Sequence, residues 1–404
     1  MELVLPHARA IADEIVGVLV RSGARAEIVG AARRAEELVE ELAIVCDRAA
    51  SEVAEIVEAA DLSLERVDGG LAGILALDHG PVAIRFRCTT IGGYVEALVR
   101  ETGSVEHVAA LDAHASARGQ DLASLSAEVA DEEALYDALE LPFVPPELRD
   151  LSTLTVPQLV ELVRGTFHVH TTWSDGIVGV APMARAARTL GLEYLGISDH
   201  SRAASYANGL DPERLALQRD DVERARHDVP GITLLHGIEC DILEDGTLDL
   251  PDEVLATLDF VVASVHSHLD LDHHAQTARV VRALANPFVT ILGHPTGRLL
   301  LGRPPITLDL DEVARAAARH GVCLEINTTA QRLDLSAVQA RRAAELGAMF
   351  CIDPDAHEPR GLETLPFGLL LARRARLSRD RVLNTRNVTD VRAHLRARRA
   401  AALA

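Results

Sequence analysis

The chain is 404 residues long, 48% of them hydrophobic and 3% aromatic, with a formal net charge of −21 at pH 7. This length exceeds one typical domain, so we expect two or three folding units with cores built mainly from Ala, Leu and Val. The negative charge argues against a protein whose whole surface attracts nucleic acid, although it is compatible with a local basic groove.

Cysteine usage and the lengths of the apolar runs predict a cytoplasmic location. The five cysteines are widely spaced and form no CxxC pair, which is typical of free thiols in a reducing compartment. The first stretch, "MELVLPHARAIADEIV", is predicted to be an amphipathic helix without the basic start of a signal peptide. No apolar run reaches the length of a membrane span, so we expect no membrane partner.

The first part of the chain is predicted to be an α+β region. Helices are expected over residues 6–22, 31–52, 91–118 and 131–139, and strands at "AEIVG" and "VAIRFR". Prolines and turn residues then gather in "LELPFVPPELRDLSTLTVPQ", which predicts a linker. The expected domains are residues 1–140, a linker over 141–164, and residues 165–404.

After the linker, seven short apolar strands alternate with helical segments. The strands are "TFHVHT", "YLGISDH", "ITLLHGIEC", "FVVASVHS", "VTILGHP", "VCLEIN" and "MFCIDPDAH". Seven successive β/α units predict an α/β fold whose parallel sheet closes into a barrel. In such barrels, active sites form at the C-terminal ends of the strands.

Polar side chains stand at the predicted end of every strand. In chain order they are His168 and His170, Asp199 and His200, Glu239, His266, His294, Asn327, and Asp355 and His357. His168 and His170 are two residues apart, so in a strand they project from the same face. Any one of these residues could be an ordinary hydrogen-bonded core side chain. Their joint occurrence at successive strand ends predicts a polynuclear metal site.

The predicted ligand set favours Mn, Zn or Fe, because it is rich in histidine, includes carboxylates and contains no thiolate. Its nine members are His168, His170, Asp175, His200, Glu239, His266, His294, Asp355 and His357. Nine ligands suffice for two or three divalent ions, with Glu239 as a bridge. Such ions activate water and stabilise a phosphoryl group under attack, which predicts phosphoester hydrolysis. Amide or amine hydrolysis stays open, although no lysine occupies a strand end.

These motifs carry a family resemblance over about residues 160–400. "HVHTTWSDG", "GISDHS", "ASVHS", "GHPTGRLL", "EINTTAQRLDL" and "IDPDAH" resemble the PHP (polymerase and histidinol phosphatase) domain of bacterial family X DNA polymerases (PolX). The resemblance implies a distorted (β/α)7 barrel with a trinuclear, usually Mn-supported site that hydrolyses phosphodiesters. It implies that the catalytic group is a metal-bound water oriented by Asp199.

The same resemblance implies that three arginines contact the substrate phosphate, namely Arg202, Arg298 and Arg332. Salt bridges on the barrel rim are the alternative for each of them. Four further histidines are assigned no chemistry. His236 is expected to pack in the core, and His268, His273 and His274 are expected in a solvated loop.

Residues 1–140 resemble, more weakly, the palm and thumb of the same polymerases, through "EIVGAARRAEELVEELAIV" and "RETGSVEHVAALDAHASARG". The resemblance places that family's three catalytic carboxylates at Glu41, Ala43 and Ala83. It places the nucleotide-binding Ser and Asn at Ala31 and Val108. Alanine at two of three metal positions cannot support two-metal nucleotidyl transfer, so we expect no polymerase activity.

The leading functional prediction is a Mn-dependent phosphoesterase that acts as a 3′–5′ exonuclease or 3′-end processing enzyme in DNA repair. A histidinol-phosphatase-like phosphomonoesterase is the first alternative, favoured by the acidic charge and disfavoured by the polymerase-type motifs. A non-catalytic DNA-binding scaffold is the second, and the complete ligand set argues against it. The expected partners are DNA 3′ ends or small phosphate esters, and the sequence predicts no oligomeric state.

Overall fold

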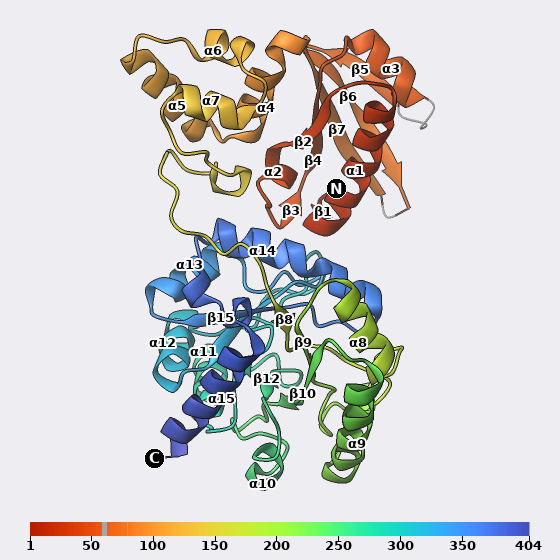
Figure 1. The fold of residues 1–404 in the computed structure, drawn as a ribbon, viewed down its shortest axis with the longest axis vertical. Helices are drawn as coiled ribbons and strands as arrows, with labels where there is room; N and C mark the ends of the chain where they lie inside the picture. The colour runs from red at the N-terminus through yellow and green to blue at the C-terminus, as the bar shows by residue number, and fades with distance from the viewer. Residues whose placement is uncertain (59–62, 79, 404) are drawn as a thin grey trace. The chain divides into compact units, whose positions relative to one another are not determined.

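The computed structural model describes residues 1–58, 63–78 and 80–403, and the chain divides into two compact units, Met1–Pro157 and Gln158–Ala404 (Figure 1). The division falls inside the segment predicted as a linker, but the part before it belongs to the first unit. There Arg149 is fully buried, donating to the carbonyl of Val144 and pairing with Glu132. A buried, paired arginine fixes the chain locally, so residues 141–149 are not a free connector.

A mixed five-stranded sheet forms the base of the first unit. Its order is β2-β4-β7-β6-β5. The strands are β2 (Ala26–Val29), β4 (Glu41–Cys46), β5 (Ser63–Val67), β6 (Gly70–Leu77) and β7 (Gly80–Cys88). Helices α1 (Leu5–Arg21) and α3 (Ala50–Glu58) pack against it, while β1 (Leu3–Val4) pairs with β3 (Leu38–Val39). The α+β character of this unit is as predicted.

Helices follow this sheet along the chain. They are α4 (Tyr94–Thr102), α5 (Val105–Ala117), α6 (Leu122–Glu128) and α7 (Glu132–Ala138), with 3-10 turns at Ile91–Gly93 and Pro146–Leu148. The helix predicted over 91–118 is interrupted at Gly103, after which the Ser104 hydroxyl accepts the N–H of His107 and caps α5. The predicted helices over 6–22 and 131–139 are confirmed by α1 and α7.

The helix predicted over 31–52 is wrong. Only α2 (Gly30–Arg33) is helical at its start, and β3 and β4 occupy most of the rest. Residues 42–46 are fully or almost fully buried in the middle of the sheet. A strand that is buried on both faces has a continuous apolar sequence, and its flanking glutamates mimicked a helical period.

Seven parallel β/α units close into a barrel in the second unit, as predicted. The third predicted strand is divided into two, β10 (Thr233–His236) and β11 (Glu239–Asp241). The other strands are β8 (Gly165–Thr166), β9 (Tyr194–Ile197), β12 (Val262–Ser264), β13 (Ile291–Leu292), β14 (Cys323–Asn327) and β15 (Met349–Asp353). One sheet contains β8 to β10 and another β11 to β15. Parallel bridges His200–Glu239 and Val169–Ala356 join their edges. The short strands and the break between β10 and β11 make the barrel distorted.

Helices lie around these strands (Figure 1). They are α8 (Val180–Thr189), α9 (Pro212–Asp228), α10 (Asp252–Leu255), α11 (His273–Leu284), α12 (Leu310–His320), α13 (Ala337–Glu345) and α14 (Leu365–Arg374). The loop predicted around His273 and His274 is therefore partly wrong. These residues are exposed, but they open α11, which Asp272 caps by accepting the N–H of Ala275. Shorter 3-10 turns cover Ser205–Ala207, Pro359–Thr364, Arg379–Arg381 and Leu383–Thr385.

The last helix, α15 (Val388–Leu403), closes one end of the barrel. Its Val391 and Leu395 join a buried cluster with Phe260 and other residues at the beginnings of the strands. Arg398 donates to backbone carbonyls of Pro287 and His320, which precede β13 and β14. Helix α15 covers the end of the barrel at which the strands begin. A functional site is therefore expected at the other end, where the strands finish.

Two smaller observations concern the predictions from composition. All five cysteines are free, and four of them are buried. In the part of the chain that the structure describes, none of the helices combines the length and apolar character needed to cross a membrane.

Candidate metal centre

The structure brings all nine predicted ligands together where the barrel strands finish. His168 and His170 follow β8, His200 follows β9, and Glu239 opens β11. The remaining ligands follow β12, β13 and β15, apart from Asp175, which stands on the loop after β8. Every one of the nine lies within 4 Å of at least one other member.

Glu239 is the centre of this cluster. Its Oε1 atom lies 3.0 to 3.3 Å from the Nε2 atoms of three histidines, which are His168, His266 and His294. Its Oε2 atom lies 2.8 Å from Nδ1 of His200 and 3.6 Å from Nε2 of His170. A carboxylate that faces imidazoles with both oxygens could share divalent ions with them if such ions were bound.

Three overlapping groups have the geometry to hold an ion. They are His170, Asp175, His200 and His357; His168, His170 and Asp355; and His200, Glu239 and His266. Within these groups, His170 Nε2 lies 3.1 Å from Asp355, His357 Nε2 lies 3.3 Å from Asp175, and His200 Nδ1 lies 2.8 Å from Glu239. Each group combines imidazole with carboxylate, the donor set that suits first-row divalent metals.

The hydrogen bonds around the imidazoles also fit metal ligands. Nε2 of His168 and both ring nitrogens of His170 are buried and make no hydrogen bond. Buried polar atoms without partners are costly, and a bound cation would satisfy them. When bound, divalent ions would lower the pKa of a water molecule and stabilise negative charge on a phosphoryl group.

Neighbouring carboxylates orient two of the imidazoles. Nδ1 of His168 lies 2.6 Å from Glu325, and Nδ1 of His266 lies 2.5 Å from Asp241, so that each Nε2 faces the cluster. Carboxylates behind ligating histidines are the usual means of fixing the ring and its tautomer. Neither Glu325 nor Asp241 was identified from the sequence. A signal was present, because each lies two residues from a strand-end residue, Asn327 or Glu239, and therefore on the same face.

Two of the predicted ligands hold unusual backbone conformations. His294 and Asp355 have φ angles of 25° and 49°, in the left-handed region that disfavours side chains with a Cβ atom. The N–H of His294 donates to Glu325 at 2.5 Å, and the side chain of Asn327 donates to Asp355 at 3.2 Å. Local strain that is held by such bonds is typical of functional sites.

The electrostatics of the cluster favour added positive charge. Burial lowers the pKa of His266, but the facing carboxylates of Glu239 and Asp241 outweigh burial and raise it to about 10. Burial also raises the pKa of Asp175, yet its hydrogen bond to His357 and the neighbouring imidazoles bring it down to about 2. The carboxylates favour a proton on the neighbouring imidazole, and a metal cation could supply the same positive charge in its place.

Asp199 is fully buried and holds a loop of the site. Its Oδ1 accepts the N–H of Thr171 at 2.7 Å and the Ser174 hydroxyl at 2.5 Å, and its Oδ2 accepts the Thr171 hydroxyl and the amide of Gln218. Both oxygens therefore hold the turn that carries Asp175. The role of Asp199 in orienting a metal-bound water stays a prediction.

The three predicted phosphate-binding arginines differ in position. Arg332 is mostly buried, and its Nε lies 3.5 Å from Oδ2 of Asp355. Arg298 donates to the backbone carbonyls of Arg332 and Leu333, and Arg202 is exposed and donates to the carbonyl of Asp249. Of the three, Arg332 is the arginine beside a predicted ligand, whereas the other two support loops.

The remaining histidines lie outside the cluster. His236 is buried and contacts Gln218 through Nε2 at 3.0 Å, as expected of a packed residue. His268 is half-exposed near Glu244. The sequence reasoning also missed Tyr206, an exposed residue whose ring lies 6.2 Å from the ring of His200.

The first unit contains no comparable cluster among its described residues. The pairing of β4 with β7 sets Glu41 beside Ala83 and Ala43 beside Arg85. The Glu41 carboxylate is neutralised by Arg85 at 3.0 Å. Of the positions at which the resemblance places polymerase carboxylates, the one that keeps a charge is therefore already paired.

Comparisons with known proteins agree with this site. Residues 166–329 match the family described as PHP domain. The DNA polymerase/3′-5′ exonuclease PolX of Bacillus subtilis strain 168 is 33% identical over 387 residues, which cover 91% of this chain and 68% of that protein. A probable phosphatase of Thermoanaerobacter sp. strain X514 is 28% identical over 229 residues, covering 54% of this chain and 89% of that protein. The chain thus belongs to the PHP-domain proteins of the PolX type and is a metal-dependent phosphoesterase.

Proposed function

We propose that the chain is a 3′–5′ exonuclease or 3′-end processing enzyme acting on DNA, and that its polymerase activity is lost. The observation that carries the proposal is the contrast between the two units. The barrel keeps a complete ligand cluster around Glu239, whereas the palm-like positions hold Ala43, Ala83 and a Glu41 that is paired with Arg85. The similarity to the PolX of Bacillus subtilis, which is named a 3′-5′ exonuclease, extends over both units.

Arg332 supports phosphate binding at this cluster. Its Nη1 atom is buried and makes no hydrogen bond, although its Nε lies beside Asp355. A guanidinium with a donor to spare next to a metal cluster is suited to hold an oxygen of a phosphodiester. In the proposed mechanism, Arg332 positions the phosphate, and the imidazoles and carboxylates around Glu239 would hold two or three divalent ions, with Mn as the preferred metal.

The test is incubation of a 5′-labelled primer–template with the protein, Mn and all four deoxynucleotides, reading product length. We expect a ladder of shortened primers, and no extension, because the palm-like positions cannot hold two metals. The His168→Ala/His170→Ala variant should leave the primer intact. Extension of the primer would contradict the loss of polymerase activity, and an unchanged primer with the wild-type protein would contradict the exonuclease.

A small-molecule phosphomonoesterase is the second candidate. It is favoured by the relatives named probable phosphatases, which match 54% and 57% of this chain, and by the charge of the first unit. That unit has 12 arginines and 29 Asp or Glu residues, a net of −17, which repels a phosphate backbone. An unchanged primer together with hydrolysis of 4-nitrophenyl phosphate would establish this candidate instead. Under either candidate function, we propose that the protein acts in the cytoplasm.

A further inference from the structure

Positive charge is concentrated at the C-terminal end of this acidic chain. Residues 373–404 contain ten arginines and two aspartates, a net of +8, while the whole chain has a net charge of −21. Several of these arginines lie on α15, the helix that closes the barrel. A local field of this sign attracts polyanions even when the protein as a whole does not.

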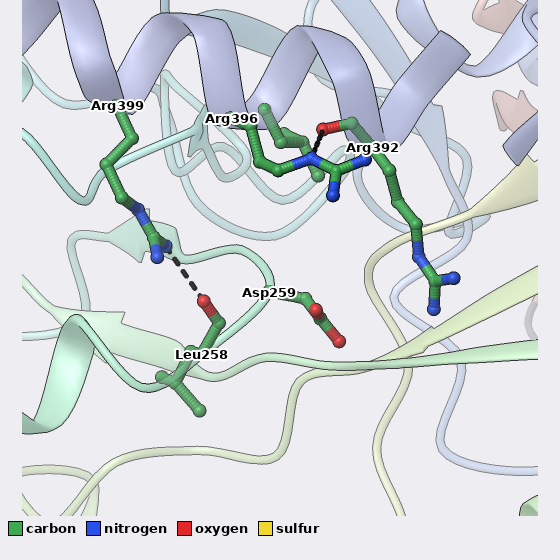
Figure 2. Close-up of a pocket in the computed structure, with 6 residues that line it drawn as sticks. Leu258, Asp259, Arg392, Arg396 and Arg399 are labelled. Atoms are coloured by element: carbon green, nitrogen blue, oxygen red, sulfur yellow. Dashed lines mark hydrogen bonds between the residues drawn. The ribbon is translucent and has the colours of Figure 1, made fainter. Parts of the chain in front are cut away.

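Three arginines of α15 border a pocket of about 260 Å³. Figure 2 shows Arg399 reaching from the helix to Leu258 in the turn that precedes β12, Arg396 lying along the helix against the carbonyl of Arg392, and Arg392 projecting from the helix. That turn contributes Leu258 and Asp259. Arg399 is held in place, donating to the carbonyls of Ala256 at 3.1 Å and of Leu258 at 2.8 Å.

The charge of this arginine face, Arg392, Arg396 and Arg399, is only partly offset by the protein. None of the three forms an ion pair with any described residue, and Arg396 donates to the backbone carbonyl of Arg392 at 3.2 Å. The negative charge of Asp259 acts on Arg399, but that carboxylate is shared, because it accepts the N–H of His236 at 2.9 Å and lies 3.6 Å from Arg226. Unpaired guanidiniums in a chain with 61 acidic residues are free to bind an external anion.

The arginine face lies at the opposite end of the barrel from the metal cluster. Asp259 precedes β12, whereas His266 follows it. A chemical group that is bound at the arginine face therefore cannot also reach the nine side chains of the predicted metal centre. The two places can be linked only by a long molecule that carries phosphates along its length.

We propose that the arginine face of α15 binds the phosphodiester backbone of the nucleic acid on which the metal centre acts. The inference rests on the proposed nucleic-acid substrate. Arg396 and Arg399 follow Arg392 by four and seven residues, about 6 Å and 10 Å along one side of the helix. This row is too long for a single phosphate and matches a chain of them. Guanidinium forks bind successive phosphate oxygens without reading the bases, so the hold is independent of sequence.

The salt dependence of binding tests this proposal. Binding of the holoenzyme to a fluorescent, cleavage-resistant phosphorothioate single strand of about 40 nucleotides would be measured by anisotropy across a range of salt concentrations. Arg392→Gln/Arg396→Gln should raise Kd about tenfold and reduce the slope of log K against log salt by about 1.4, the value for two lost contacts. Arg224→Gln/Arg315→Gln removes the same charge from exposed, paired arginines and should leave the slope unchanged.

An unchanged slope in the Arg392→Gln/Arg396→Gln protein would overturn the proposal. Displacement of the strand by millimolar inorganic phosphate, in the wild type and not in that variant, would indicate a pocket for one phosphate and would also overturn it. Hydrolysis of bis(4-nitrophenyl) phosphate tests the metal centre separately. If neither the wild type nor the variant hydrolyses bis(4-nitrophenyl) phosphate, the proposed function is contradicted. If the slope of log K against log salt still falls in the Arg392→Gln/Arg396→Gln protein, binding of a nucleic-acid backbone by the arginine face is nevertheless supported.

Discussion

Glu325 is the residue on which two predicted ligands depend at once. Its Oε1 contacts Nδ1 of His168 at 2.6 Å, and its Oε2 accepts the N–H of His294 at 2.5 Å. Glu325→Gln keeps the size of the side chain but replaces one acceptor with a donor. We expect metal affinity to fall 10- to 100-fold, the usual effect of losing a partner behind a ligating histidine. Titration against a fluorescent chelator measures it.

Glu312→Gln serves as the control for this variant, because Glu312 is exposed on α12 of the same barrel. Its metal affinity should equal that of the wild type. The variant at position 325 should remain folded, and an excess of Mn should restore most of its phosphoesterase activity. Equal affinity in all three proteins would show that Glu325 does not orient the site.

At the scale of elements, α5 is joined to its neighbours through a buried histidine. Nε2 of His107 lies 2.8 Å from the hydroxyl of Tyr136 on α7, and Nδ1 lies 3.3 Å from the carbonyl of Leu151. Burial, assisted by the charge of Arg149, lowers the pKa of His107 to about 4. The folded state therefore keeps this imidazole neutral at a pH where the unfolded chain already binds a proton.

This difference predicts how the stability of the first unit depends on pH. The stabilisation that the first unit gains from the neutral His107 is fully present above the ordinary histidine pKa of about 6.5. It is lost as the pH falls toward 4, and the loss in the free energy of unfolding is about 3 kcal/mol at most. His107→Gln should flatten the pH dependence of the free energy of unfolding in this window. Chemical denaturation at a series of pH values measures the difference between the two proteins, which cancels the titration of the barrel. Parallel curves would contradict the assignment.

At the scale of the whole molecule, the two compact units should respond differently to metal. The ligand clusters found in the described residues all lie in the second unit, so metal binding should stabilise that unit alone. Differential scanning calorimetry should show two transitions, one of them raised by Mn and lowered by EDTA. A metal concentration of about 100 times Kd corresponds to about 2.7 kcal/mol of stabilisation.

In the His168→Ala/His170→Ala protein, the metal-dependent shift should disappear while the other transition keeps its temperature. A shift of both transitions by Mn in the wild type would show that the units do not unfold separately. It would also be the result if the first unit held a metal of its own.

The barrel and the clustering of its candidate ligands were predictable because each β/α unit repeats one local pattern, an apolar strand that ends in a polar side chain, which is His, Asp or Glu in six units and Asn327 in the other. The first unit was harder, since β4 is buried on both faces and so lacks the alternation that identifies a strand. The positions of Arg202 and Arg298 were not predictable, because they depend on loop carbonyls that no periodicity describes. Glu325 could have been found by following the alternation of β14 inward from Asn327.

The closure of the barrel by α15 has a consequence for the speed of folding. Val391 and Leu395 share a core with Phe167, which lies far from them in the sequence. Contacts between residues far apart in the sequence require long loops to close, which costs entropy and slows folding. The barrel should therefore reach its native packing late, when α15 docks against the beginnings of the strands.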